Sequence, residues 1–353
     1  MSDRQTTIKD VALACGVSAS TVSRALSGKI PVNRETMERI KQAAERLHYV
    51  PSILAQSLKE GSSRTIGLIV PDITNPVFPA VALGAETEAV RQGYQIFLTH
   101  SHENPEQEKQ LAQMLIQRQV DGLLIATSCR GQASPADWLP ESVPVCQLVR
   151  RQTDRLPSVT VDQFMLGRLA ARHLLETGRK KPLILAGDQT LAIHRDRLEG
   201  FRQTLKQANI ELPQERIIDS SMNDENGVRI TFNLLRAFQA SIDSIFAASD
   251  MQALGVIRAL GLRQISVPRQ IAVIGLDNLG ISALCTPTMT CISQPLQEVG
   301  RLACQRLLEN LHSGQIRREE EKTGITGAAG IKSGQPAVRH DLLPCELYIG
   351  ETT

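Results

Sequence analysis

Aromatic side chains are scarce in this chain of 353 residues, at 3%, so a ligand site has few rings available for stacking. The seven cysteines form no C-x-x-C pair and no zinc-like spacing, and a thiol within an apolar run is usually a small core residue. No apolar run approaches the roughly 20 residues of a membrane span, and the opening MSDRQTTIKD lacks the apolar core of a signal peptide. We therefore expect a cytoplasmic protein with reduced thiols.

The chain also lacks the common short motifs of enzymes. It contains no G-x-x-x-x-G-K-[ST] phosphate loop, no G-x-G-x-x-G after a strand and no G-x-S-x-G nucleophile turn. The histidines give no metal-ligand set, and solvated or core histidines are the commoner case; they are His48, His100, His102, His173, His194, His312 and His340. The sequence thus predicts neither an enzyme nor a metal or cofactor site.

What is present is a chain long enough for two or three compact units, with 42% hydrophobic residues to form their cores. The net charge of +2 is unevenly placed. Residues 1–64 hold ten Lys and Arg against six Asp and Glu, and the remainder holds 29 against 31. A basic head on a slightly acidic body fits a phosphate-binding end attached to another domain.

The stretch TIKDVALACGVSASTVSRALSG, Thr7 to Gly28, has the spacing of two short helices. Ile8, Val11, Ala12 and Cys15 follow i, i+3, i+4, i+7, and Gly16 can take the positive φ at which that helix ends. Ser18 can cap a second helix in which Val22 and Leu26 point inward. Such a pair is a helix-turn-helix, although spacing alone also fits an ordinary helical hairpin.

A third helix is predicted after Asn33, a good N-cap, with an apolar stripe of Met37, Ile40, Ala44 and Leu47. Pro51 then ends that helix. Ser52 can cap the short segment ILAQSLK, which is too short to be a stable helix alone.

From Arg64 the pattern becomes short apolar strands alternating with helices, which predicts α/β units with parallel sheets. The strands are TIGLIVP, YQIFLT, GLLIA, VPVCQLV, PLILA, SIFA and IAVIGL. So many units indicate two similar subdomains, and ligands of this class bind outside the carboxyl ends of the strands. The segments DITNP, ATSC, ASD and GLDN fall at those ends.

These stretches resemble the lactose-repressor/galactose-repressor family of bacterial regulators. The similarity runs from Thr7 to about Ile316 and resumes at Leu342. Its most specific pieces are TIKDVA, GVS-x-STVSR, the SLK hinge, IGLIVPDITNP, VDGLLIA, RLEGF, FAASDMQALG, IAVIGLDN and TCISQP. The resemblance implies a three-helix helix-turn-helix head and a hinge helix, joined to a two-subdomain α/β body like that of the periplasmic sugar receptors.

By the same resemblance, the head and hinge bind operator DNA. Ser18, Thr21 and Asn33 would contact phosphates, while Ala19, Ser20 and Arg24 would face base edges. Leu58 would wedge between base pairs of the minor groove, or else rest on the body as a linker residue. The full set expected at DNA is Thr7, Ser18, Ala19, Ser20, Thr21, Ser23, Arg24, Asn33, Leu58 and Lys59.

The resemblance further implies an effector site between the subdomains, formed by Asn75, Phe78, Thr127, Arg197, Ser249, Asp277 and Gln294. Alternatives exist for single members: Asp277 could cap a helix, and Arg197 could pair with Asp196 or Glu199. One departure concerns the strand VPVCQLV, after which the family usually carries an Asp and this chain has Val149, Arg150 and Arg151. Ser249 also stands where an Asn is frequent. These departures predict a ligand that is less hydroxyl-rich than a plain hexose, or acidic, unless the two arginines point into solvent.

We accordingly expect a DNA-binding domain over 1–50, a hinge and linker over 51–64, and an effector-binding and dimerisation domain over 65–353. The segment from 317 to 340 looks like an exposed, loop-like insertion before a last strand, LLPCELYIG. The predicted function is that of a homodimeric, nucleoid-associated repressor whose operator affinity is switched by a sugar or sugar acid. A solute receptor without a transcriptional role is the alternative, and the helix-turn-helix argues against it.

Overall fold

The computed structural model describes residues 6–27, 32–50, 61–128, 133–219, 224–238, 241–323 and 338–353. The chain divides into two compact units, Met1–Ser63 and Arg64–Thr353, here called the head and the body. The predicted hinge helix, with Leu58 and Lys59, lies outside the described residues.

The head is a bundle of three helices: α1 (Ile8–Cys15), α2 (Ala19–Ser27) and α3 (Arg34–Arg46). Val11, Val22 and Ile40, one from each helix, are fully buried against one another. Gly16 ends α1 with a φ of 63°, a conformation that glycine adopts without strain. The predicted three-helix core is therefore confirmed.

Local sequence also sets where the three helices begin. The Thr7 and Asp10 side chains form a reciprocal capping box at the start of α1. The Thr21 amide donates to the Ser18 hydroxyl at 3.2 Å, and the Glu35 amide donates to the Asn33 side chain at 2.9 Å. Each cap satisfies a backbone donor that the helix itself leaves unpaired.

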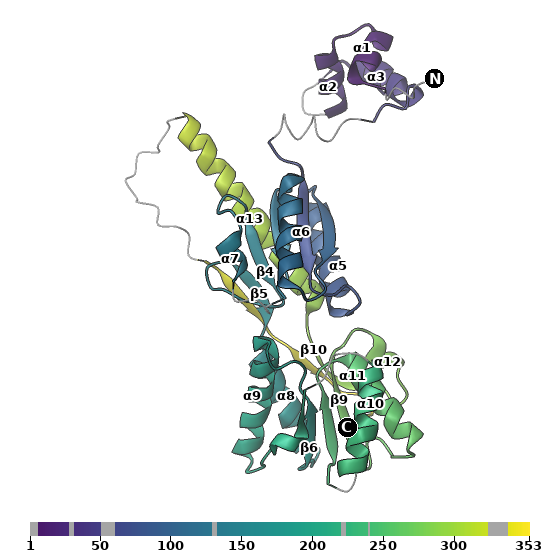
Figure 1. The fold of residues 1–353 in the computed structure, drawn as a ribbon. Coiled ribbons are helices and arrows are strands. Elements are labelled where there is room, and N and C mark those ends of the chain that lie inside the picture. The colour runs from purple at the N-terminus through teal and green to yellow at the C-terminus, as the bar shows by residue number, and fades with distance from the viewer. Residues whose placement is uncertain are drawn as a thin grey trace. The chain divides into compact units, whose positions relative to one another are not determined.

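The body contains two six-stranded sheets (Figure 1). In the first subdomain the strand order is β11-β5-β4-β3-β1-β2, and in the second it is β12-β10-β9-β8-β6-β7. All neighbouring strands are parallel except β12, which is antiparallel to β10. The strands are β1 (Thr65–Val70), β2 (Gln95–His100), β3 (Gly122–Ile125), β4 (Val145–Leu148), β5 (Ser158–Val161), β6 (Pro182–Leu185), β7 (Ile217–Ile218), β8 (Ser244–Ala247), β9 (Ala272–Asp277), β10 (Thr290–Ser293), β11 (His340–Leu343) and β12 (Glu346–Tyr348).

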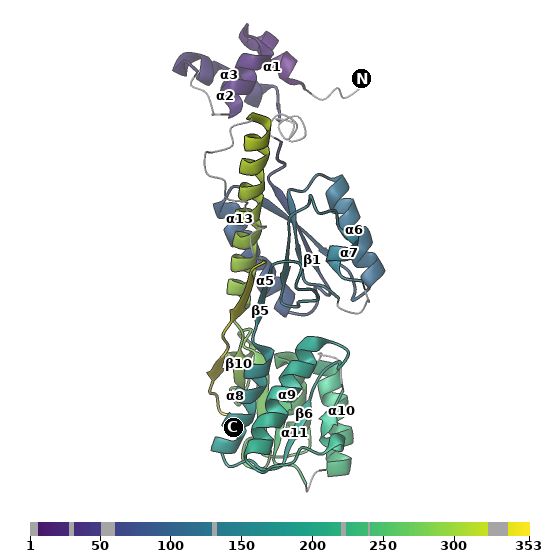
Figure 2. The same ribbon diagram turned by 90° about the vertical axis from the view of Figure 1, so that its left-hand side faces the viewer.

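Helices cover both faces of each sheet, so the strands read as continuous apolar runs. In the first subdomain α5 and α13 pack on one face and α6 on the other; in the second, α8 and α9 oppose α10 and α11 (Figure 2). No helix within the described ranges is both long and apolar enough to cross a membrane. The helices are α5 (Val77–Arg91), α6 (Pro105–Gln117), α7 (Pro135–Trp138), α8 (Gln163–Glu176), α9 (Ala192–Gln207), the 3-10 turn η1 (Gln214–Arg216), α10 (Asp224–Phe238), α11 (Asp250–Leu262), α12 (Ile281–Leu284) and α13 (Leu296–Thr323).

Three segments pass between the subdomains. The chain crosses after β5 into α8, returns after β10 into α13, and crosses a last time between β11 and β12. Each crossing joins the two α/β subdomains. This is the two-subdomain architecture predicted from the sequence. Any closure of the cleft must therefore rotate about these three crossings.

Two expectations near the C-terminus were wrong. The stretch 317–340 is not a loop throughout: α13 continues to Thr323, because Arg, Glu and Lys are good helix formers, and β11 begins at His340. The residues 324–337 between them lie outside the described ranges. LLPCELYIG is not one strand, because Pro344 interrupts it, so that β11 and β12 belong to different sheets.

Glycines allow two helix pairs to approach closely, one pair in each subdomain. A Cβ on Gly84 of α5 would lie 1.8 Å from the Gln297 carbonyl oxygen, and one on Gly300 of α13 would lie 1.9 Å from that of Val81. In the second subdomain, a Cβ on Gly167 of α8 would lie 1.9 Å from the Arg197 carbonyl oxygen. The glycines therefore let α5 pack closely against α13 and α8 pack closely against α9. The second pair positions α9, the helix that carries Arg197.

Candidate ligand-binding and DNA-binding sites

A cavity of about 660 Å³ lies in the body, where the carboxyl ends of strands from both sheets face one another. Residues after β1, β2, β4 and β5 form one wall, and residues after β6 to β10 form the other. Six of the seven predicted effector residues line it together: Asn75, Phe78, Arg197, Ser249, Asp277 and Gln294.

A chain of hydrogen bonds joins four residues that line the cavity. Arg197 donates to the Gln163 side-chain oxygen at 3.2 Å from Nε and 2.6 Å from Nη2. Gln163 in turn donates to the Gln294 oxygen at 3.0 Å, and Gln294 donates to Asp277 at 2.7 Å. Arg197 and Asp277, which come from distant parts of the sequence, are thereby joined through two amides, and the four residues are called the relay below.

The contacts of Arg197 and Asp277 bear on the alternatives that the sequence left open for these two residues. Arg197 bonds Gln163 and the Ala248 carbonyl, the latter at 3.1 Å, rather than Asp196 or Glu199. Asp277 does not cap α12, whose N-cap is Gly280, but its carboxyl accepts the main-chain amide of Asp250, the first residue of α11. Its role at a helix start therefore exists beside its place in the relay.

Burial shifts the protonation of both charged ends. It lowers the pKa of the Arg197 guanidinium to about 10, while the Asp277 carboxyl opposes that shift. Burial and the neighbouring Asp250 carboxyl together raise the pKa of Asp277, and Arg197 opposes the rise. Arg197 therefore remains a cation at neutral pH. Burial brings the pKa of Asp277 to about 8 against the opposing effects of Arg197, the Gln294 amide and the Asp250 main-chain amide, so the neutral carboxyl is favoured there.

The backbone at Asp277 is strained. Its φ is 108° and that of Asn278 is 58°, in a region that side-chain-bearing residues adopt reluctantly. The strained residues lie where β9 ends at the cavity, and Asp277 there accepts a hydrogen bond from Gln294. Strain of this kind is often concentrated at binding sites.

Arg150 does not point into solvent. Only 6% of it is exposed, and both of its terminal nitrogens donate to Glu103 at 2.9 Å. Its guanidinium also lies 5.7 Å from the centre of the Phe78 ring, a cation–π contact. The next residue, Arg151, is exposed and lies 3.4 Å from Asp154. One of the two arginines is thus a cavity residue, with its charge already paired.

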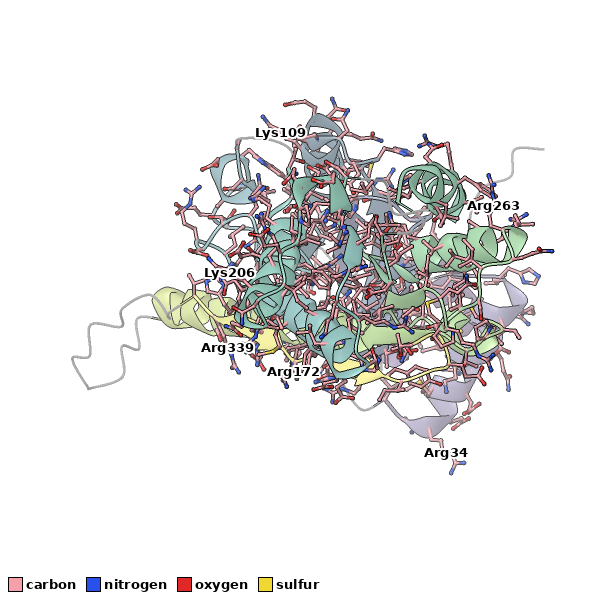
Figure 3. All side chains as sticks on the ribbon, turned by 90° about the horizontal axis from the view of Figure 1, so that it is seen from below. Arg34, Lys109, Arg172, Lys206, Arg263 and Arg339 are labelled. Atoms are coloured by element: carbon pink, nitrogen blue, oxygen red, sulfur yellow. The ribbon has the colours of Figure 1, made fainter. Side chains whose placement is uncertain are left out.

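Buried basic side chains are rare in the part of the chain that the structure describes. Among the described Arg and Lys residues, Arg150 and Arg197 are the two that are buried. The side chains of Lys109, Lys206 and Arg263 instead extend from the periphery of the body (Figure 3). The two cavity arginines are therefore exceptions to the general pattern of basic residues here.

Thr127 is the predicted effector residue that the structure does not bring to the cavity. It is fully buried behind Arg150, and its carbonyl accepts a hydrogen bond from that side chain at 3.3 Å. Ser249 lines the cavity but also caps α11, because its hydroxyl accepts from the Gln252 amide at 3.1 Å.

Sequence reasoning missed Gln163, Arg150 and His194 as cavity residues. Gln163 follows the strand SVTV, so recognising that strand would have placed it at a carboxyl end. His194, regarded from the sequence as a solvated or core histidine, is 6% exposed and lines the cavity. No three His, Cys, Asp or Glu side chains in the described part of the chain are grouped so as to hold a metal ion.

The head carries the predicted DNA-facing residues on and around α2. Ser18, Ser20 and Arg24 are exposed, whereas Ala19 and Ser23 are half-buried. The Ser18 hydroxyl lies 2.8 Å from both the Ser20 and the Thr21 hydroxyl. Asn33 is exposed at the start of α3, and Thr7 belongs to the capping box of α1. Six of these residues gather around the start of α2 or project from its surface.

A helix-turn-helix head followed by a two-subdomain body with a cavity between its sheets defines a class of protein: DNA-binding regulators that carry a ligand-binding domain. A model described as bacterial regulatory proteins, lacI family, matches residues 7–52. A second, described as periplasmic binding proteins and sugar binding domain of LacI family, matches residues 63–330.

Individual relatives agree with these matches. The HTH-type transcriptional repressor PurR of Actinobacillus pleuropneumoniae serotype 3 is 33% identical, covering 86% of this chain and 91% of that protein. The ribose operon repressor of Halalkalibacterium halodurans is 31% identical, covering 87% and 90%. A solved structure of the transcriptional regulator CelR with cellobiose is 26% identical, covering 99% of this chain and 100% of that one, with a TM-score of 0.69. The chain belongs to the lacI family of bacterial regulatory proteins.

Proposed function

We propose that this regulator is a dimeric repressor whose affinity for an operator is set by a neutral, polyhydroxylated ligand bound in the cleft cavity. The observation that carries this is the relay, which joins Arg197 to Asp277 across a cavity of about 660 Å³. That volume is in the range typical of small-molecule sites. Its similarity to a ribose operon repressor and to a cellobiose-bound regulator supports a sugar-like ligand.

The charges of the lining favour a neutral ligand over a sugar acid. Five carboxylic side chains line the cavity against two arginines; the carboxylic residues are Asp72, Glu103, Asp188, Asp219 and Asp277. Glu103 neutralises Arg150, and Arg197 is engaged with Gln163 and a carbonyl. An incoming carboxylate would meet net negative charge, whereas hydroxyl groups can donate to the carboxylates and accept from the amides.

The cavity also offers a limited apolar surface for one face of a sugar or nucleoside ring. Phe78 supplies the aromatic part, and Leu191, Ile193 and Met251 supply the aliphatic part. We assign the cavity binding without catalysis, because Arg150 is paired with Glu103 and Arg197 is engaged by Gln163 and the Ala248 carbonyl.

At the DNA, Arg24 and Ser20 are proposed to read base edges and Ser18, Thr21 and Asn33 to hold phosphates. The protein would act in the cytoplasm on the nucleoid, where its operator lies. Ligand binding shifts operator affinity only in so far as the ligand binds the two body conformations unequally.

Dimerisation is supported by apolar residues exposed on one edge of the first subdomain. Strand β2 is an edge strand, and Phe97 and Leu98 on it are 52% and 41% exposed. Leu83 and Val90 on the adjacent α5 are 51% and 63% exposed. An exposed apolar sheet edge is a common site of association.

The test is a thermal-shift screen of the purified full chain against sugars, the matching sugar acids and nucleosides, followed by calorimetry on the ligands that stabilise it. We expect a neutral ligand to bind and Arg197→Ala to abolish binding while operator binding in gel shifts persists. A preference for the sugar acid over its neutral partner would contradict the ligand class. Unchanged ligand binding by Arg197→Ala would show that the cavity is not the site.

A further inference from the structure

His194 lies on α9 one turn before Arg197 and lines the same cavity, yet it belongs to none of the hydrogen bonds of the relay. Its ring nitrogen Nδ1 lies 2.9 Å from the main-chain carbonyl oxygen of Asp188. A carbonyl oxygen can only accept, so Nδ1 must carry the proton. The ring's other nitrogen, Nε2, then has a lone pair in the neutral form.

We propose, building on the ligand class above, that His194 is a specificity residue: its Nε2 is an acceptor that requires a ligand hydroxyl or N–H beside Arg197. The Nε2 atom bonds no residue in the described part of the chain, and its side chain faces the cavity. It is therefore the side of the ring that is available to a ligand.

The neighbouring Arg197 makes this requirement more selective. Its three bonds to the protein use Nε–H and one hydrogen on each terminal nitrogen, and a guanidinium has five N–H groups. A cavity donor and a cavity acceptor therefore stand one helical turn apart. A hydroxyl satisfies both, because its oxygen accepts from Arg197 while its hydrogen is donated to His194. A carboxylate cannot donate and would leave Nε2 facing a lone pair.

The surroundings keep the ring neutral. Burial lowers the pKa of His194 to about 3, and the charges of Arg197 on the same helix and Arg150 after β4 add to the effect. The Asp188 carbonyl and carboxyl act in the opposite direction but do not offset the burial. Asp219, after β7, and Asp277, at the end of β9, are the further titratable groups on this wall of the cavity. His194 is thus an acceptor throughout the physiological pH range.

The first measurement needs no ligand. Long-range nitrogen–proton NMR of the histidine rings in the full chain, assigned with His194→Gln, should show His194 protonated on Nδ1 and unchanged from pH 5 to 8. A ring that titrates in this range, or that is protonated on Nε2, would overturn the inference.

The second measurement uses D-ribose, cellobiose, adenosine and D-gluconate as probes in calorimetry. For any neutral probe that binds the wild type, His194→Leu should weaken binding about tenfold, the value of one hydrogen bond, while His194→Gln should stay within about threefold. Equal binding by wild type and His194→Leu would overturn the inference. His173→Leu, which removes a buried histidine away from the cavity, is the matched control and should leave probe binding unchanged.

Failure of the proposed ligand class has a different signature. In that case no neutral probe binds, or D-gluconate binds best. Tight binding of D-gluconate by a protein whose His194 is protonated on Nδ1 would overturn the selectivity assigned to His194. Circular dichroism of the same variants shows whether each of them folds.

Discussion

Single side chains in this protein have roles that depend on whether they are exposed or buried, and Arg24 and Glu108 illustrate the two cases. Arg24 is exposed on α2, and its Nε donates to the Ser20 carbonyl at 3.3 Å. In that position the guanidinium is close to where α2 would enter a major groove, and its terminal nitrogens can form the paired bonds that a guanine accepts.

We expect Arg24→Ala to cost roughly 1–3 kcal/mol of operator binding and to relax base preference at one position in each half-site. Binding-site selection followed by quantitative gel shifts measures both effects. Arg39→Ala, an exposed arginine on α3, is the control and should preserve the base preference. A selected consensus that is the same for Arg24→Ala and wild type would remove Arg24 from the base-reading surface.

Glu108 on α6 is a buried carboxyl, 3% exposed, that accepts the Ser128 amide at 2.7 Å. Burial raises its pKa from 4.5 to about 7. Because the folded pKa is the higher one, the neutral carboxyl favours the folded state. This contribution to the free energy of unfolding is fully present below about pH 4.5, and it is lost as the pH rises to about 7. The whole contribution is at most roughly 3 kcal/mol.

Glu108→Gln keeps the acceptor without the charge, so the unfolding free energy of the variant should fall less between pH 5 and 8 than that of wild type. Urea unfolding followed by the fluorescence of Trp138, the chain's one tryptophan, reports on the same core cluster as α6. Glu141→Gln, an exposed glutamate, should show the wild-type pH dependence. Parallel pH profiles for wild type and Glu108→Gln would mean that Glu108 is ionised in the folded chain.

At the scale of whole elements, the close contact of α8 with α9 positions two cavity residues, Arg197 and His194. Gly167→Ala would place a methyl group against the Arg197 carbonyl, so the helices must separate. We expect a loss of roughly 1–3 kcal/mol in unfolding free energy, and a weaker thermal shift with any ligand of the cavity.

Gly261 in α11 provides the matched control, because a Cβ there meets nothing within 4 Å. Gly261→Ala should be neutral, or more stable by up to about 1 kcal/mol, since alanine favours helix. Equal stability of Gly167→Ala and wild type would show that α8 and α9 can separate without cost.

Elements set by local sequence could be predicted, and contacts between distant elements could not. The head follows from a 3.6-residue period, a cap at Asn33 and a turn at Gly16, all of which are local signals. Arg197 and Asp277 could be predicted through the family resemblance. The burial of Arg150 could not, because it depends on Glu103, 47 residues earlier. The place of Gln163 in the cavity could not be predicted from these contacts either, because its partners Arg197 and Gln294 lie 34 and 131 residues away.

At the scale of the whole molecule, association is expected along the edge strand β2. Phe97→Lys introduces a charge into the exposed apolar surface, so it should convert the protein to monomers and weaken operator binding, because one head then contacts one half-site. Sedimentation velocity at micromolar concentration measures the first effect and gel shifts measure the second.

Gln95→Lys adds the same charge to an exposed position of the same strand and should leave the dimer intact. A dimer that persists in Phe97→Lys would locate the interface elsewhere on the molecule.

The relay has a polarity that constrains how its end can be changed. A guanidinium only donates, so Gln163 must turn its oxygen to Arg197 and its amide nitrogen to Gln294, which in turn must donate to Asp277. Asp277→Asn keeps this order, since the new side chain can offer its own oxygen to Gln294. The Asp277 carboxyl also accepts the main-chain amide of Asp250, the first residue of α11. An asparagine offers one oxygen to these two donors, so a substitution that keeps the order of the relay would weaken the start of the helix beside it.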